Sequence, residues 1–227
     1  MPGIFQGADE IDDLRLGSSQ VDAVYQGGEL VWPVAVIFVT DSVTDGEESD
    51  GRVTLTIPSS VETGDLMVVT GMFNNPAAGE LDSPGWTTVF SGSSLLGWKI
   101  FDGVETTVLT VDASSRKTFG MCAFRGAVAG ASSRDTGGTS VTCPNLTAAA
   151  SGAAMFNCCG DTTSVGGIQI PDPPVDYTTI WYREFSFAVC HNAYQLDQSA
   201  GLVTSTPFLN TIDVTNTQRI SLMIERS

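Results

Sequence analysis

The sequence predicts an all-β protein: an antiparallel β-sandwich of jelly-roll-like type, preceded by a short N-terminal segment of β-repeats. Strand-like segments recur along the whole chain after Pro33. Gly, Pro, Asn, Asp or Ser separate most of them, at intervals of about 8 to 15 residues, as in sandwiches and barrels. No segment of ten or more residues shows the apolar period of 3.6 that marks an amphipathic helix.

The expected strands of the body follow from local patterns, taken in chain order. Residues 34–39 form a continuous apolar run, whereas 53–57 alternate apolar and threonine side chains, as a half-buried strand does. Further strands are expected at 64–73, 86–90, 95–101, 106–111, 119–124, 152–159, 179–190, 211–214 and 219–225. About ten strands are enough for two packed sheets of four to six strands each. We expect loops at 41–51, 125–141 and 166–177.

Residues 1–33 differ from the body because they contain an internal repeat of ten residues. Residues 11–20 align with 21–30 on a shared pattern: aliphatic, Asp, any residue, aliphatic, any two residues, Gly. A partial copy precedes them at 4–7, and a third copy begins at Val31 and ends at Pro33. Each unit is typical of a short strand followed by a glycine turn.

Strands this short bury little apolar surface by themselves, so we expect residues 1–33 to be an assembly or anchoring segment. The sandwich domain then occupies residues 34–227. An ordinary N-terminal hairpin of the main sheet is the alternative. The expected interface consists of the apolar side chains of the repeat: Ile11, Leu14, Leu16, Val21, Val24, Tyr25, Val31 and Trp32.

Charge and composition exclude several kinds of partner. Aspartate and glutamate outnumber lysine and arginine by 26 to 10, giving a net charge of −16, which opposes general electrostatic binding to nucleic acid or anionic lipid. The first residues lack a secretory signal, and no apolar run reaches the ~20 residues that cross a bilayer. We therefore expect assembly in a cytoplasm, without membrane insertion. Five cysteines, an odd number, indicate free thiols rather than a disulfide scaffold.

The residue types needed for catalysis are sparse. His191 is the only histidine, and the chain has neither a nucleophile-elbow motif nor a phosphate-binding glycine loop. The adjacent Cys158 and Cys159 lack the spacing of zinc ligands, and the acidic residues 41–50 do not match a calcium loop. We predict a protein that is not an enzyme, with no catalytic residues, no metal ligands and no cofactor.

Aromatic side chains leave one binding hypothesis open. Trp86, Trp98, Trp181 and Tyr182 fall within or beside expected strands, where core packing is the ordinary role. The alternative is a platform for sugar rings, in which Trp181 and Tyr182 contact a ligand or receptor.

The stretch 24–32, VYQGGELVW, resembles the N-terminal segments of tailed-bacteriophage virion proteins, where short units ending in glycine precede the main body. Residues 64–69, 84–87, 123–127 and 219–225 are similar to a β-sandwich of such proteins. The resemblance implies a tail, fibre or decoration protein that is usually oligomeric, and it implies no catalytic residues.

Together these features predict a structural component of a tailed-phage particle, located in the virion. We expect a tail-tip, fibre-associated or host-adhesion protein that assembles through its N-terminal segment, as a homotrimer and with other virion proteins. One alternative is a capsid decoration protein whose N-terminal arm clamps neighbouring capsomers. Another is a carbohydrate-binding module whose partner is a host surface glycan.

Overall fold

The structure is a computed structural model of the chain. It describes residues 36–46, 53–73, 81–109, 117–162, 169–170, 172–185, 188–209, 211 and 214–227, together with the backbone of four short strands between residues 15 and 32. Two compact units make up the chain, Met1–Ala35 and Val36–Ser227. We call them the N-terminal unit and the body. The division lies two residues beyond the predicted boundary at Pro33.

The N-terminal unit contains two antiparallel hairpins. The first pairs β1 (Arg15–Leu16) with β2 (Ser19–Gln20), and the second pairs β3 (Val24–Gln26) with β4 (Glu29–Trp32). Leu16 is the register partner of Ser19, and ten residues later Gln26 is the partner of Glu29. The ten-residue sequence repeat therefore corresponds to a repeat of hairpins in the same register.

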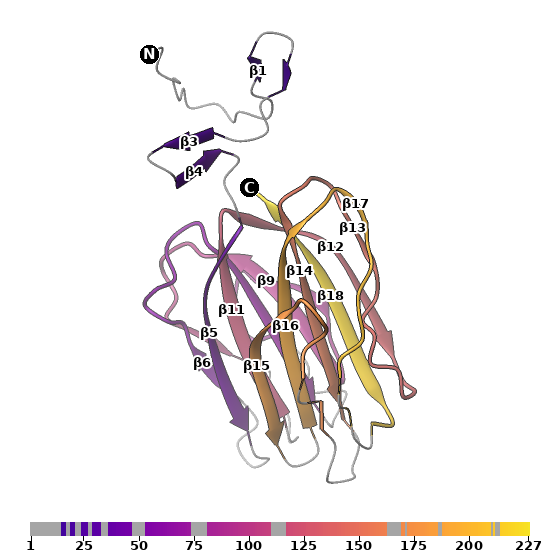
Figure 1. Cartoon of the computed structure of the whole chain (residues 1–227). Helices are drawn as coiled ribbons and strands as arrows, with labels where there is room; N and C mark the ends of the chain where they lie inside the picture. The colour runs from indigo at the N-terminus through magenta and orange to yellow at the C-terminus, as the bar shows by residue number, and fades with distance from the viewer. Residues whose placement is uncertain are drawn as a thin grey trace. The chain divides into compact units, whose positions relative to one another are not determined.

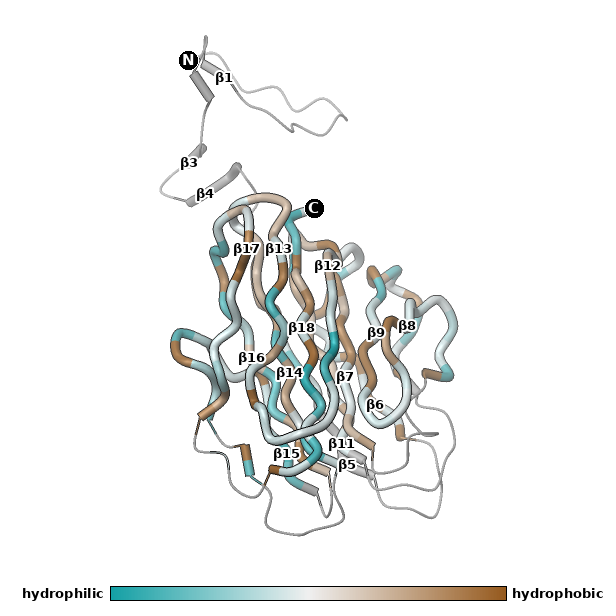
Figure 2. Tube along the Cα trace, turned by 90° about the vertical axis from the view of Figure 1, so that its right-hand side faces the viewer, coloured by the Kyte–Doolittle hydropathy of each residue, from teal (hydrophilic) through white to brown (hydrophobic). Residues whose placement is uncertain are grey.

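The body consists of two five-stranded antiparallel sheets; most of their strands are labelled in Figure 1, and β7 and β8 are labelled in Figure 2. The first sheet has the order β5-β11-β7-β9-β8 and contains β5 (Ile37–Gly46), β7 (Leu66–Phe73), β8 (Thr87–Phe90), β9 (Ser94–Ile100) and β11 (Lys117–Arg125). The second has the order β12-β18-β14-β16-β15 and contains β12 (Ala127–Thr136), β14 (Ala153–Asp161), β15 (Thr178–Phe185), β16 (Ala188–Gln198) and β18 (Thr217–Arg226).

Two small antiparallel pairs complete the body. One joins β6 (Thr54–Thr56) to β10 (Thr107–Leu109), and the other joins β13 (Leu146–Ala148) to β17 (Gly201–Val203). The predicted all-β antiparallel sandwich is thereby confirmed. The body resembles a jelly roll in having two packed sheets, but its strand order differs. Strands do not alternate between the two sheets along the chain: the five strands of the first sheet all precede the five strands of the second.

The two halves of the body repeat one topology. Residues 36–126 provide β5 to β11, and residues 127–227 provide β12 to β18, seven strands each. Adding seven to each strand number converts the order of the first sheet into that of the second, and converts the pair β6–β10 into β13–β17. The sandwich is thus an internal duplication in which each half forms one sheet and its own small pair.

Local geometry repeats along with the topology. Gly64 and Gly152, both at positive φ, donate their backbone N–H groups to the carbonyls of Phe101 and Gln198, at 2.9 and 2.8 Å. These bonds fix the starts of β7 and β14 in the same way. The halves also share a short sequence: WTTVF at 86–90 and YTTIW at 177–181, each preceded by a residue at positive φ.

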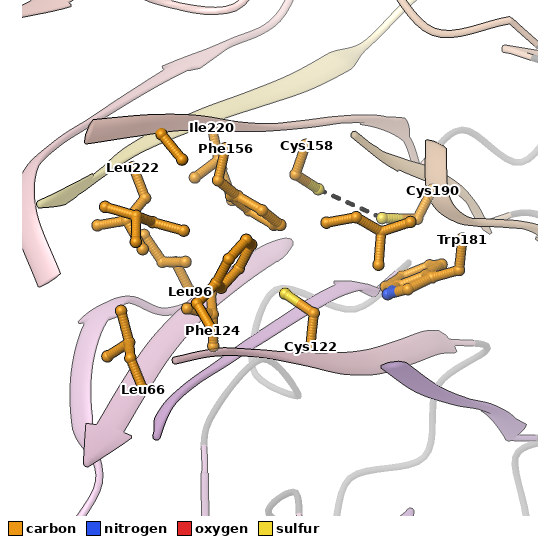
Figure 3. Close-up of a cluster of buried hydrophobic side chains, with 14 of the residues drawn as sticks. Leu66, Leu96, Cys122, Phe124, Phe156, Cys158, Trp181, Cys190, Ile220 and Leu222 are labelled. Carbon is orange, nitrogen blue, oxygen red and sulfur yellow. Dashed lines mark hydrogen bonds between the residues drawn. The ribbon is translucent and has the colours of Figure 1, made fainter. Parts of the chain in front are cut away.

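Three apolar clusters hold the layers together. The central cluster lies between the sheets and takes side chains from both, including Leu66, Leu96, Phe124, Phe156, Ile220 and Leu222 (Figure 3). The second cluster packs β6 and β10 on the outer face of the first sheet. The third packs β13 and β17 on the outer face of the second, where Figure 2 shows this pair. Both faces of β7 and β14 are consequently buried, which explains their nearly continuous apolar sequences.

Several sequence predictions need correction. Residues 125–141, predicted to be a loop, contain the edge strand β12, whose small and polar side chains suit partial exposure to solvent. The predicted single strand 179–190 is instead parts of β15 and β16, which pair with each other. In the predicted strand 211–214, residues 211 and 214 are not in a strand, and residues 212–213 lie outside the described part of the chain.

Candidate functional site

His191, the only histidine, lies fully buried on β16. Its Nδ1 lies 2.7 Å from the carbonyl oxygen of Ile170, to which it donates, and its Nε2 lies 2.9 Å from the hydroxyl of Thr179. The rings of Tyr182 and Phe208 contact the imidazole edge to face. Burial lowers the pKa of His191, and the bond to Ile170 offsets this only in part. The neutral ring therefore ties β15 and the segment at 170 to β16.

The five cysteines are free and buried. Cys158 and Cys190 extend from neighbouring strands into the central cluster with their sulfurs 3.3 Å apart, and Cys122 faces them from the other sheet (Figure 3). Burial raises the pKa of the Cys122, Cys158 and Cys159 thiols well above their usual range. Since the thiolate is the reactive form, these groups behave as small apolar side chains.

Trp181 is a core residue, which corrects its prediction as a ligand contact. Its indole is 5% exposed and lies in the central cluster, against the backbone of Gly120. Tyr182, the next residue of β15, packs on the opposite face of the sheet, half-buried, and donates to the Glu184 carboxylate at 3.3 Å. Because the two rings point to different layers, they do not form a shared platform for a sugar.

Five of the residues predicted to form the assembly interface lie on described backbone. Leu16 is in β1, Val24 and Tyr25 are in β3, and Val31 and Trp32 are in β4. Val24 and Trp32 are register partners across the second hairpin. The other three, which lie outside the described residues, are Ile11, Leu14 and Val21.

An ion pair that the sequence did not suggest joins β7 to β11. Asp65, almost fully buried at the start of β7, accepts from Arg125 Nε at 2.9 Å and from Arg125 Nη2 at 3.0 Å. It also accepts the backbone N–H of Glu62 at 2.9 Å. Burial alone would raise the pKa of Asp65, but the hydrogen bonds to Arg125 and Glu62 outweigh it and lower this pKa. In the sequence, the only sign of this ion pair is the position of its two charged residues beside glycine at the ends of apolar runs: Asp65 after Gly64 and Arg125 before Gly126.

Two further hydrogen-bonded buried side chains are Thr70 and Asp161. Thr70 donates to Asn192 across the two sheets at 2.8 Å. Asp161 accepts the backbone N–H groups of Thr215 and Asn216 at 2.8 and 2.9 Å. Among the described residues, no group of three or more His, Cys, Asp or Glu side chains could hold a metal ion. These polar groups position strands and loops.

The exposed apolar side chains of the body provide a surface feature. Large hydrophobic residues with substantial exposure are Ile37, Ile100, Val104, Val128, Val175, Leu202 and Leu209. Ile37, Ile100 and Val128 lie at or next to strand ends at one end of the sandwich, where β11 is followed by β12.

Comparison with known proteins adds no further guide: no protein-family model, curated protein or solved structure matches the chain. No helix long and apolar enough to span a membrane occurs among the described residues.

Proposed function

We propose that the chain is a structural assembly protein whose N-terminal unit joins it to identical copies and to other proteins of a particle. The observation that carries the proposal is the repeat of two hairpins in one register, within a unit distinct from the body. The strands of these hairpins are two to four residues long. An isolated hairpin is at best marginally stable in water, so such a unit gains stability by packing against partners.

Three-fold self-assembly is the form we propose, because a closed symmetric ring lets several short hairpins bury one another. The proposed setting is the virion of a tailed phage, in a tail-tip, fibre-associated or host-adhesion protein. The resemblance of residues 24–32 to the N-terminal segments of such proteins supports this setting.

The body supports a structural role over an enzymatic one. The groups most suited to chemistry are engaged in the fold: both nitrogens of His191 have partners, and the thiols are buried. Four layers held by three apolar clusters make the body a rigid module that the N-terminal unit would hold in place. A capsid decoration protein would use the same two parts, with the N-terminal unit on neighbouring capsomers. The carbohydrate-binding alternative loses its main residue, because the Trp181 ring is in the core.

The test introduces charge into the second hairpin of the full chain. Val24→Asp with Trp32→Asp places two carboxylates at register partners, where mutual repulsion opposes pairing and packing. We expect sedimentation velocity to give a trimer for the unmodified chain and a monomer for the variant, with an unchanged unfolding temperature of the body.

Two outcomes contradict the proposal. A variant that associates like the unmodified chain would show that the hairpin does not form the interface. A variant in which the body melts at a markedly lower temperature would show that β3 and β4 belong to the main fold.

A further inference from the structure

The two halves of the body meet through side chains and share no sheet. Every strand ladder among the described residues pairs strands of the same half, either 36–126 or 127–227. The inner faces of the two sheets meet in the central cluster. Side-chain hydrogen bonds also cross between the halves, including the 2.8 Å bond from Thr70 to Asn192. The halves can therefore separate without the loss of any strand pairing.

A single residue connects the two halves. β11 ends at Arg125 and β12 begins at Ala127, and Gly126 between them has a φ of 65°. Glycine adopts this left-handed conformation readily, whereas other residues do so at a cost. If Gly126 became extended, β11 would continue directly into β12, and the two halves of one copy could no longer face each other. Short connections of this kind favour exchange of structural elements between copies.

The inner face of each half fits the other half specifically. Trp181 of the second half lies against Gly120 of the first, where a Cβ atom would overlap the indole. In the opposite direction, Met72 of the first half lies against Gly160 of the second, where a Cβ atom would overlap the Met72 side chain. A partner for the inner face of one half must therefore present the complementary half. A second copy of this chain carries that half.

We infer that two copies of this chain exchange halves, so that residues 127–227 of each copy pack on residues 36–126 of the other. The exchanged dimer retains the central cluster and the bond from Thr70 to Asn192, and the conformation of Gly126 is what changes. Exchange of this kind is a low-cost route to a dimer because the contacts already exist in the single chain. Separation of the halves exposes the central cluster, so exchange takes place during folding at high concentration. The inference goes beyond the proposed function, since it joins bodies without the N-terminal unit.

The first test asks whether two defective chains repair each other. Both full-length chains carry Val24→Asp and Trp32→Asp, so that the hairpins do not contribute to association. One chain also carries Gly120→Val, and the other Trp181→Ala. Exchange between them creates one sandwich with the native glycine and tryptophan, and one in which the added side chain enters the space left by the indole. Refolded together from urea, they should form a heterodimer in native mass spectrometry that melts about 5 °C or more above either chain refolded alone.

The second test changes the connection between the halves in the same hairpin background. Gly126→Val should raise the association constant of the refolded chain about tenfold or more, because valine is unfavourable at positive φ and both connections of the exchanged dimer relieve it. Gly138→Val is the matched control, since Gly138 has a φ of 72° and open space around it but lies within the second half. The control should change association less than about twofold, because exchange does not alter its backbone. Sedimentation velocity over a concentration series measures both.

Other results contradict the inference. A mixture that gives no heterodimer, and that melts like the two chains refolded separately, would show that halves do not exchange. A heterodimer without the gain in melting temperature would indicate a surface contact instead. Equal association of the Gly126 and Gly138 variants would show that the connection does not control pairing. Because every chain carries the charged hairpin, these results are separate from those that test the N-terminal interface.

Discussion

Removal of the Trp181 indole provides a quantitative test of the sandwich core. The ring fills the space between the sheets beside Gly120, where a Cβ atom would overlap the indole. Truncation of a buried tryptophan to alanine costs about 3–5 kcal/mol of unfolding free energy. In a domain of this size each kcal/mol shifts the melting temperature by about 2–4 °C, so we expect Trp181→Ala to lower it by about 6–20 °C.

Gly120→Ala tests the same contact from the other side. The added methyl group must displace the indole, and overpacking of this kind costs about 1–3 kcal/mol. Combining Gly120→Ala with Trp181→Phe frees part of that space, so the double variant should be more stable than the sum of the two single changes, by about 0.5–3 kcal/mol. Urea unfolding followed by circular dichroism measures all three variants.

Gly130→Ala is the matched control, because Gly130 is exposed on the edge strand β12 and its methyl group would meet mainly the side chain of Glu225 on β18. It should cost less than Gly120→Ala, whose methyl group meets a buried ring. Additive free energies for Gly120→Ala and Trp181→Phe would refute the proposed contact. A cost below about 1 kcal/mol for Trp181→Ala would refute the burial of the ring.

Three further predictions concern the rest of the body. Because burial disfavours the thiolate, no cysteine of the native protein should react with an aromatic disulfide reagent, and all five should react after unfolding; rapid native reaction of any thiol would contradict this. Asp65→Asn should cost about 1–3 kcal/mol at pH 7, and the difference should shrink as the pH falls below about 4. The reason is that the pKa of Asp65 is lowered in the native protein, so its carboxylate stabilises the fold at pH values above the unfolded-state pKa. This stability is lost as the native carboxyl protonates. A pH-independent difference in urea midpoints would exclude this role. Residues 36–126 and 127–227, produced as separate chains and refolded together, should regain the β-sheet spectrum of the intact body, whereas failure under conditions that refold the intact body would argue against two complementary halves.

The sequence was sufficient to predict the fold class because β7, β9, β11, β14 and β18 are long apolar strands bounded by turn residues. It was insufficient for β12, since an edge strand covered on few sides tolerates the small and polar residues that also occur in loops. The short strands β6, β10, β13 and β17 are identified as a covering layer only by the tertiary contacts that bury them.

Two features depended on geometry that local patterns do not encode. Apart from the short shared sequence at 86–90 and 177–181, the duplication rests on strand order, and even equivalent turn positions can carry different residues, such as Gly85 and Asp176, which share a positive φ. The direction of the Trp181 side chain depends on an irregularity in the β15–β16 ladder between Thr179 and Trp181. Simple alternation along the strand therefore does not indicate whether this ring faces solvent or core.

The most direct test of the assembly role is hydrogen exchange of the hairpin amides in the full chain. At concentrations where the unmodified chain associates, we predict slow exchange in β3 and β4. Val24→Asp with Trp32→Asp, or dilution to the monomer, should remove this protection, while β7 and β14 remain protected. Rapid exchange of β3 and β4 in the associated chain, or equal protection in the monomer, would contradict the claim that the N-terminal unit joins the copies.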